Sequence, residues 1–409
     1  MFDTKLINLV KTLISKRSIT PEDDGVMGIL TTFLQKIGFE NEIKIFSSTK
    51  HDVKGDIKGE EKQESVLNLY SYKKFAEGKN LCFAGHVDVV HPGKEYKWTY
   101  PPFEPTIENG ILYGRGVSDM KAAIACFCIA AEELLTDGFV PNGTISFLIT
   151  GDEEGSGENG TKKMLEHITN KGIKIDDCLV GEPTNPQIMG TMIKIGRRGS
   201  INFELKIEGQ QGHLAYPENF LNPIEAMASI VLALKQHKFD EGNEFFDPTN
   251  LEFFKIEADN IASNVVSNGA MCGFNVRFNN LHSGDDIKNA IEKIIKNQIE
   301  KLNTQNIKVN FTYKYSLKSA LSGNSFLTDS KKASVVAMQN AVDLICSTKP
   351  VLSTTGGTSD ARFIKNYANT LEFGMISKTA HQIDEHEKVE DIIILKNIYK
   401  QFIKNYFQN

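Results

Sequence analysis

The sequence predicts an α/β fold: a mostly parallel sheet flanked by helices, with an inserted smaller α+β domain that has an antiparallel sheet. Three observations carry this prediction. Nearly continuous apolar runs, which fit strands buried on both faces, occur at 81–90, 144–150 and 177–180. Polar loops and helical patterns separate these runs, which is typical of parallel strands connected by helices. Beyond residue 199 apolar and polar residues alternate strictly, as in an antiparallel sheet with one solvated face.

The composition excludes several classes of protein. The chain has 409 residues, 40% of them hydrophobic and 24% charged, which is ordinary for a globular protein of two or three domains. Its net charge of −6 argues against a nucleic-acid partner, and no apolar run reaches the ~18 residues of a membrane helix. The first 18 residues are amphipathic, unlike a signal peptide. Six cysteines without a CxxC pair indicate reduced thiols, so we expect a cytoplasmic protein without a membrane partner.

The elements follow from the spacing of apolar residues, taken in chain order. Two amphipathic patterns in the first 38 residues predict two helices. The charged stretch 47–80 is interpreted as a solvated insertion or mobile loop, with short strand content around 66–72. The remaining predictions are a loop at 92–113, helices at 120–135, 224–234, 287–302 and 332–346, alternating strands at 201–207, 274–278 and 309–315, a strand at 371–375, and a last helix from 389. We expect one domain formed by 1–198 and 312–409, and the inserted domain at 199–311.

Each buried strand ends in acidic or imidazole side chains. His86 and Asp88 follow the first strand, Glu153 and Glu154 the second, and Glu182 the third. Because ligands of open α/β sheets bind at the carboxyl ends of strands, we expect these side chains to lie at one edge. Histidine and carboxylates are suitable ligands for zinc, cobalt or manganese.

Taken singly, each of these residues also has an ordinary structural explanation. His86 and Asp88 fit a solvated strand end, and the adjacent glutamates at 153 and 154 fit an acidic surface loop. Asp119 precedes a helix, where a carboxylate satisfies free amides. His381 fits a surface imidazole. Their joint placement at separate strand ends is what favours a site for two metal ions.

The order of short motifs resembles a known family. GHVDVV, GRGVSDMK, GDEEGSG, VGEPT, GRRGS, QGHLAYP, GGTSDARF and EFG…AH look like the co-catalytic metallohydrolase family of acetylornithine deacetylase, glutamate carboxypeptidase and succinyl-diaminopimelate desuccinylase. The resemblance covers nearly the whole chain. GRRGS, QGHLAYP and GGTSD look most like the desuccinylase branch of that family.

The resemblance implies a metal-binding role for five residues. His86, Asp119 and Glu182 would hold one ion, and Asp119, Glu154 and His381 the other, so that Asp119 bridges the pair. Zinc is the expected metal, with cobalt as an alternative in the second site.

The resemblance also implies roles in catalysis and assembly. Asp88 would orient His86, and Glu153 would act as general base and acid. The inserted domain would mediate a homodimer, in which His213 reaches the partner's active site and stabilises the oxyanion. A packed loop histidine remains the alternative for His213.

A substrate with several carboxylates requires cations, for which arginine is well suited. The candidates from the residues themselves are Arg197 and Arg277, although Arg277 also fits a surface strand and either Arg197 or Arg198 could turn inward. The substrate-binding residues that the resemblance then implies are Arg197, Tyr216, Asn264, Arg277, Gly357 and Thr358. Two departures from the family are the long stretch 47–80 and Ser377, which stands where some desuccinylases carry Asn.

The implied function is metal-dependent hydrolysis of the amide bond of N-succinyl-L,L-diaminopimelate, giving succinate and L,L-diaminopimelate in lysine and diaminopimelate biosynthesis. An acetylornithine deacetylase or a related deacylase or peptidase is the alternative within the family. A catalytically silent binding protein on the same frame is the alternative outside it, but every expected ligand and Glu153 are present.

Overall fold

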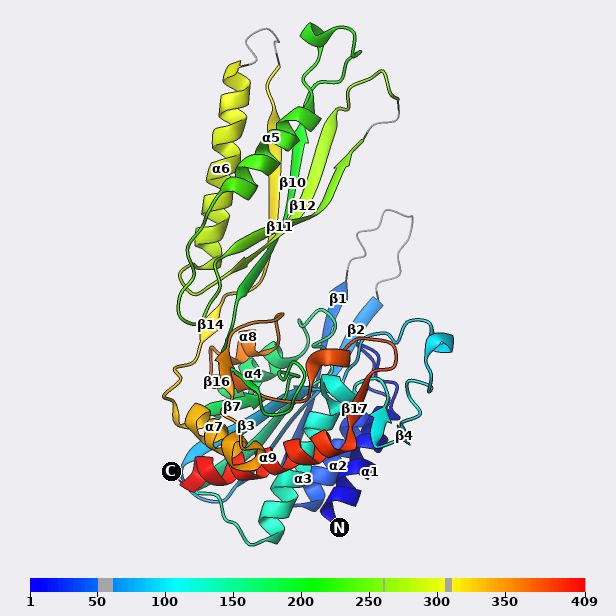
Figure 1. The fold of residues 1–409 in the computed structure, drawn as a ribbon, viewed down its shortest axis with the longest axis vertical. Coiled ribbons are helices and arrows are strands. Elements are labelled where there is room, and N and C mark those ends of the chain that lie inside the picture. The colour runs from blue at the N-terminus through cyan, green and yellow to red at the C-terminus, as the bar shows by residue number, and fades with distance from the viewer. Residues whose placement is uncertain (51–61, 260–261, 306–310, 409) are drawn as a thin grey trace. The chain divides into compact units, whose positions relative to one another are not determined.

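The computed structural model describes residues 1–50, 62–259, 262–305 and 311–408, and the chain forms two compact units (Figure 1). The larger unit comprises Met1–Gly196, Thr328–Ser353 and Ser359–Asn409. The smaller unit comprises Arg197–Leu327 and Thr354–Thr358.

The larger unit is built on an eight-stranded sheet within the described residues. In sheet order its strands are β1 (Glu40–Lys50), β2 (Lys62–Lys74), β6 (Gly143–Thr150), β3 (Lys79–His86), β7 (Asp177–Val180), β16 (Asn369–Glu372), β8 (Met192–Lys194) and β15 (Val351–Ser353). The central strands β6, β3, β7 and β16 run parallel, whereas β1, β2 and β6 pair antiparallel and β16 meets β8 antiparallel. The predicted α/β class is confirmed, with a sheet that is mixed at its margins.

Helices cover both faces of this sheet (Figure 1). They are α1 (Phe2–Ile14), α2 (Val26–Lys36), α3 (Ala122–Thr136), α4 (Thr161–Asn170), α7 (Ala333–Cys346), α8 (Ala361–Ile364) and α9 (Val389–Gln408). Helix α3 packs against α1 and α9, and the ring of Phe83 on β3 stacks on Phe127 of α3 at 4.5 Å between centroids. Because helices bury both faces, β3 carries no solvated apolar–polar alternation, which explains its continuous apolar run.

The strand content predicted around 66–72 is confirmed by β2. The prediction of a loop is wrong for 47–50, 62–65 and 73–74, which also belong to β1 and β2, and for 79–80, where β3 begins. Strands β1 and β2 pair in unbroken antiparallel register from Glu40 opposite Tyr72 to Lys50 opposite Lys62, and β3 begins at Lys79. Residues 51–61 lie outside the described residues. Side-chain spacing did not predict β1 because it is an edge strand. In such a strand backbone hydrogen bonds fix the register, and the exposed side chains need not be apolar.

The smaller unit contains a four-stranded antiparallel sheet in the order β11 (Asn250–Ala258), β12 (Gly269–Phe278), β10 (Gly199–Glu208) and β13 (Lys314–Gly323). Its core is formed where alternate residues of β10, such as Phe203 and Leu205, pack with α5 (Pro223–Gln236) and α6 (Gly284–Gln305). Each helix begins at a polar cap: Asn222 accepts from Ile224 N, and Ser283 and Asp286 exchange hydrogen bonds.

The second crossing between the units falls at Thr328, later than the expected residue 312, because β13 pairs with β10 from Lys314 to Gly323. The alternating stretch 309–315 was expected to be a strand. Residues 309–310 lie outside the described residues, and the strand itself begins at Lys314. Strand β11 was not predicted, since most of its side chains are exposed.

The remaining short elements connect these layers. They are β4 (Thr106–Glu108), β5 (Ile111–Tyr113) and β17 (His386–Lys388), the pair β9 (Gly196–Arg197) and β14 (Phe326–Leu327), and the short helical turns η1 (Glu95–Lys97), η2 (Val117–Lys121), η3 (Pro217–Asn219) and η4 (Ser377–Thr379). Among the described residues, no helix is both long and apolar enough to cross a bilayer.

Candidate metal centre

The candidate site lies at the carboxyl ends of the parallel strands of the larger unit. His86 is the last residue of β3, Glu153 and Glu154 follow β6, and Glu182 follows β7. His381 follows β16 by way of the turn η4. Since β6, β3, β7 and β16 are neighbours in one sheet, their ends converge although the chain visits them far apart.

Two glycines allow the backbone to approach this close. A Cβ on Gly85, next to His86, would lie 2.6 Å from Met120 Cε, and one on Gly181, next to Glu182, would lie 2.6 Å from the same atom. Met120 directly follows Asp119 on the turn η2. A larger side chain at either glycine would therefore force the Met120 side chain, which packs beneath the two strand ends, to move.

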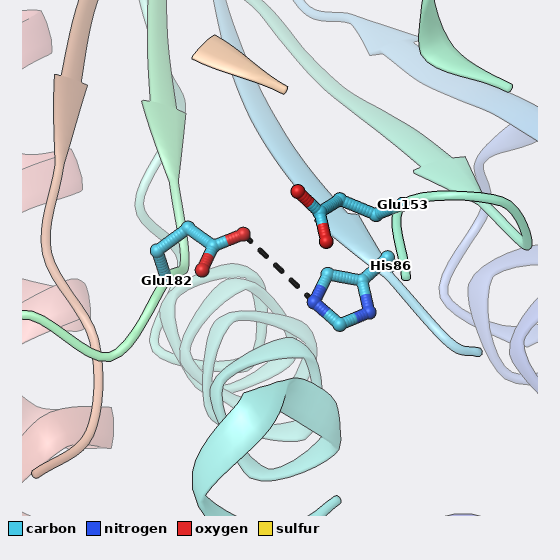
Figure 2. Close-up of side chains that lie close together, drawn as sticks. All are labelled: His86, Glu153 and Glu182. Carbon is cyan, nitrogen blue, oxygen red and sulfur yellow. Dashed lines mark ion pairs between the residues drawn. The ribbon is translucent and has the colours of Figure 1, made fainter. Parts of the chain in front are cut away.

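His86 is the centre of the cluster. Its imidazole is 1% exposed, and its Nδ1 donates to the backbone oxygen of Asp88 at 2.9 Å. Because a carbonyl oxygen only accepts, Nδ1 carries the hydrogen and Nε2 can offer its lone pair to a metal. His86 Nε2 lies 3.1 Å from Asp119 Oδ1. The same nitrogen is 3.8 Å from Glu182 Oε1, the ion pair marked in Figure 2.

Asp119 lies between two imidazoles. While its Oδ1 faces His86, its Oδ2 lies 3.2 Å from His381 Nε2. The same His381 nitrogen lies 2.7 Å from Glu154 Oε1. One carboxylate thus offers an oxygen to each of two groups of donors, which is the arrangement that a carboxylate bridging two metal ions requires.

The Asp88 carboxylate has a contact that the sequence did not suggest. Its Oδ1 accepts from Glu153 N at 3.2 Å and its Oδ2 from Glu154 N at 3.0 Å, whereas His86 Nδ1 is 3.6 Å from Oδ1. Asp88 therefore holds the backbone of the two glutamates, and its own carbonyl orients His86. Burial raises the pKa of Asp88 to about 6.

Glu153 points toward His86 and Glu182 (Figure 2). Ligand atoms of these three residues lie within 4.8 Å of one another, and so do those of His86, Asp119 and Glu154. Burial raises the pKa of Glu153 well above its ordinary value, and the negative charge of Glu182 adds to the shift. A carboxyl group that readily holds a proton beside the cluster is suited to general acid–base chemistry.

The charges of the cluster favour cations. Burial alone would lower the pKa of His86, yet the hydrogen bond and charge of Asp119 outweigh it and raise that pKa. Hydrogen bonds to Asp119 and Glu154 raise the pKa of His381 to about 10. Imidazole nitrogens and carboxylate oxygens are the donors that bind zinc, cobalt or manganese. The residues present thus fit a divalent metal centre.

The predicted residues of the smaller unit form separate groups. His213, Tyr216 and Asn264 are exposed and come together in two loops, where Leu214 N donates to Asn264 O at 3.1 Å and the rings of His213 and Tyr216 lie 5.6 Å apart. Arg197 is buried and its Nη1 donates to Gly357 O at 3.0 Å.

Arg198 and Arg277 are the other two arginines of the smaller unit that bear on the predicted substrate binding. Arg198 is partly exposed and donates to Asn250 Oδ1 at 3.0 Å, so Arg197 is the one of the pair that turns inward. Burial lowers the pKa of Arg277, and the positive charge of Arg198 lowers it further.

Thr358 is half-buried and adjoins Gly357. Ser377 Oγ, in the larger unit, donates to Asn185 O at 3.3 Å.

Two buried carboxylates near the cluster were not singled out from the sequence. Asp152 accepts from Ser156 N and Asn159 N, both at 3.0 Å, and so shapes the loop after β6. Glu385 binds the backbone around Asp119. Most of their partners are backbone amides, which leave no pattern in side-chain spacing, although Glu385 also accepts from Arg115 Nη1. Only nearness to the predicted ligands could have suggested them.

Comparison with known proteins identifies the family. The model of Peptidase family M20/M25/M40 matches residues 82–405. The chain belongs to this family. The resemblance inferred from the motifs is thereby confirmed.

Relatives with curated names are similar over almost their full length. The succinyl-diaminopimelate desuccinylase of Pelagibacter ubique (strain HTCC1062) is 46% identical, with 98% of each chain covered. That of Wolbachia pipientis subsp. Culex pipiens (strain wPip) is 44% identical, with 98% of this chain and 93% of the relative covered.

Solved structures share the fold at low identity. An M20 family metallo-carboxypeptidase from Sulfolobus solfataricus has a TM-score of 0.74 at 17% identity, covering 99% of this chain and 100% of that one. A dinuclear metal binding peptidase of the M20 family from Bacillus subtilis has a TM-score of 0.67 at 15% identity, covering 98% and 97%.

Proposed function

We propose that this chain is a metal-dependent amidohydrolase that converts N-succinyl-L,L-diaminopimelate to succinate and L,L-diaminopimelate. The reaction class rests on one observation: Asp119 offers one oxygen toward His86 and the other toward His381. The substrate is taken from the relatives named succinyl-diaminopimelate desuccinylase, which are 46% and 44% identical over nearly the whole chain.

We assign two divalent ions to the cluster, with zinc as the expected metal and cobalt as an alternative in the second site. His86, Asp119 and Glu182 would hold one ion, and Asp119, Glu154 and His381 the other. When bound, such a pair supplies Lewis-acid chemistry, lowering the pKa of water and polarising the amide carbonyl. The donor types support this assignment. So do the distances of His86 Nε2 from Asp119 Oδ1 (3.1 Å) and Glu182 Oε1 (3.8 Å), and of His381 Nε2 from Asp119 Oδ2 (3.2 Å) and Glu154 Oε1 (2.7 Å).

The chain's own residues would then carry the proton. Glu153, which is partly buried beside His86 and Glu182, takes a proton from the attacking water and returns it to the leaving nitrogen. Asp88 keeps Glu153 and Glu154 in place through their backbone amides. His213 is proposed as the donor that stabilises the oxyanion.

Substrate carboxylates are assigned to groups of the smaller unit. Arg277 lies near Arg198, and two like charges repel each other, so a bound carboxylate between or beside them would relieve that repulsion. We therefore propose Arg277 as a carboxylate-binding residue. Arg197 is proposed as a second one on the resemblance to the family and because it is the inward-turning arginine of the pair. Tyr216, Asn264, Gly357 and Thr358 are proposed as further substrate contacts.

We also propose a homodimer formed through the smaller unit, the inserted domain. Strand β11 is an edge of its sheet, and Phe254 and Ile256 on that strand are 66% and 60% exposed. An exposed apolar edge strand favours pairing with another chain. A cytoplasmic location is proposed on the cysteines: the six described ones are free, as in a reducing compartment.

Activity assays with metal analysis test the proposal. The purified protein should contain about two zinc equivalents per chain and should hydrolyse N-succinyl-L,L-diaminopimelate faster than N-acetylornithine. Removal of metal by a chelator should abolish turnover, and added zinc should restore it. Faster hydrolysis of acetylornithine or of a dipeptide would overturn the substrate assignment, and full activity of the metal-free protein would overturn the reaction class.

A further inference from the structure

A buried carboxylate joins the two segments that carry the shared ligand and the last histidine. Glu385 lies four residues after His381 and is fully buried. Its Oε1 accepts from Ser118 N at 2.8 Å and from Asp119 N at 3.2 Å. Its Oε2 accepts from Gly116 N at 3.0 Å and from Arg115 Nη1 at 2.7 Å.

The segment that Glu385 binds has no regular structure of its own to satisfy these amides. Asp119 has φ −128° and ψ 96° inside the turn η2, which are not helical values. Backbone N–H groups at such a buried turn need an acceptor, and a carboxylate provides the strongest one. The position of Asp119 therefore depends on a side chain that belongs to the other ligand segment.

The segment of His381 is fixed by a second contact. His381 has φ +62°, a left-handed conformation that is uncommon for a residue with a side chain. The turn that contains it is closed where Thr379 Oγ1 donates to His386 O at 2.8 Å, and Ser118 Oγ lies 3.2 Å from Thr379 Oγ1. Glu385 and Thr379 thus connect the His381 turn to the Asp119 turn.

We infer that Glu385 is a positioning residue of the metal centre, which sets the separation of Asp119 and His381 through the backbone of residues 116–119. This inference rests on the proposed function, because it takes Asp119 and His381 as ligands. Outer partners of metal ligands contribute about 10–100-fold to metal affinity. Since Asp119 is proposed to serve both ions, loss of Glu385 should weaken the binding of both.

Glutamine is the informative replacement. In Glu385→Gln one carboxylate oxygen becomes an NH₂ group, which is a donor. In one orientation that group faces the amides of Ser118 and Asp119, and in the other it faces Gly116 N and the Arg115 guanidinium. Either orientation sets donor against donors at a buried position, although the size of the side chain is unchanged.

The matched control is Asp177→Asn. Asp177 is also buried in the larger unit, where it accepts from Ser334 Oγ and Tyr406 OH, each at 2.7 Å. It begins β7, whereas the proposed ligands follow the strands' carboxyl ends. Both substitutions remove one buried, hydrogen-bonded carboxylate, but only Glu385→Gln touches the proposed ligand segments.

The test is binding of Zn²⁺ to the full-length apo-protein, measured by competition with a chromophoric chelator, together with the visible absorption spectrum of the Co²⁺-loaded protein. We expect Glu385→Gln to weaken Zn²⁺ binding about 10–100-fold and to change the Co²⁺ spectrum. Asp177→Asn should lower the unfolding temperature of the apo-protein while its Zn²⁺ affinity and Co²⁺ spectrum remain those of the original chain.

Wild-type affinity and spectrum in folded Glu385→Gln would overturn the inference, as would an equal loss of affinity in Asp177→Asn. If Glu385→Gln does not fold, Glu385→Asp decides, because it keeps the charge but shortens the reach to the amides of residues 116–119. A loss of about 10-fold in affinity supports the inference, and unchanged affinity with an unchanged Co²⁺ spectrum overturns it. These readouts do not depend on the substrate. An original chain that binds two ions but leaves N-succinyl-L,L-diaminopimelate intact would therefore refute the proposed substrate and not the role of Glu385.

Discussion

The residues predicted for chemistry behave differently in the two units. In the larger unit the proposed ligands are close together, and Asp119 contacts both His86 and His381. His86 and Glu182 are buried, Asp119 and Glu154 are partly buried, and His381 is exposed. In the smaller unit the candidates fall into separate groups, and His213, Tyr216 and Asn264 are exposed. The difference arises because parallel strands bring their ends to one edge, whereas an antiparallel sheet spreads its loops over both ends. Buried charges also shift one another's pKa values strongly, and exposed ones are screened by water.

The largest effect is expected from Glu153→Gln in the buried cluster. The glutamine keeps the shape of the side chain but cannot take up a proton, so kcat should fall ~10²–10⁴-fold while metal content and unfolding temperature stay unchanged. Steady-state kinetics with metal analysis measure this. Glu158→Gln, which changes an exposed glutamate of the same loop, should leave kcat unaltered. Near-normal turnover of Glu153→Gln would remove Glu153 from its proposed role.

A smaller effect is expected from Arg277→Gln in the smaller unit. Loss of one hydrogen bond to a charged substrate group is equivalent to about 1.5–3 kcal/mol, so kcat/KM should fall roughly 10–100-fold, mostly through KM. Lys206→Gln, on the neighbouring strand β10, serves as the control because its side chain is exposed and faces Glu204. If Arg277→Gln leaves KM as it was, the comparison between the units becomes sharper, since the smaller unit would then contribute less to substrate binding than proposed.

The smallest effect is expected from Glu42→Gln, at the surface of the larger unit. Burial alone would raise the pKa of the Glu42 carboxyl group. Hydrogen bonds from Lys171 at 2.6 Å and His167 at 2.7 Å outweigh burial and lower this pKa from 4.5 to about 2. A lowered pKa stabilises the fold above pH 4.5, and that contribution is lost as the pH falls toward 2.

Urea unfolding measures this contribution. At pH 7 Glu42→Gln should lower the free energy of unfolding by no more than about 1 kcal/mol, because the pair is near the surface. The difference in the free energy of unfolding between Glu42→Gln and the original chain should become smaller as the pH is lowered from 4.5 toward 2. A difference that grows on acidification would show that Glu42 does not contribute through these ion pairs. Glu108→Gln, at an exposed position, is the control.

Much of the fold and of the candidate site could be predicted because the relevant signals lie in side chains. Continuous apolar runs marked β3, β6 and β7, and the acidic or imidazole residues after them marked the edge of the sheet. Strand β1 could not be predicted in the same way, although the middle of its partner β2 was expected to contain a strand. Ile43 and Ile45 on β1 are 43% and 62% exposed, so the apolar residues of this strand do not mark a buried face. The strand is held by backbone pairing with β2.

The same reason explains what was missed within the site. The Asp88 carboxylate lies 3.6 Å from His86 Nδ1, as expected, but its hydrogen bonds to the amides of Glu153 and Glu154 were not foreseen. Glu385 sits in the acidic run HQIDEHE, where composition alone suggests a solvated loop, but it is fully buried. Side chains that bind backbone amides leave no periodic pattern, since every residue except proline offers the same N–H group.

The dispersal of the proposed ligands along the chain, from His86 to His381, has a consequence for biogenesis. A nascent polypeptide that does not yet include His381 cannot gather the full donor set. Capture of the ions must then come late, after distant segments have met, and such distant pairings are the slow part of folding. Metal uptake during synthesis would accordingly report completion of the whole larger unit.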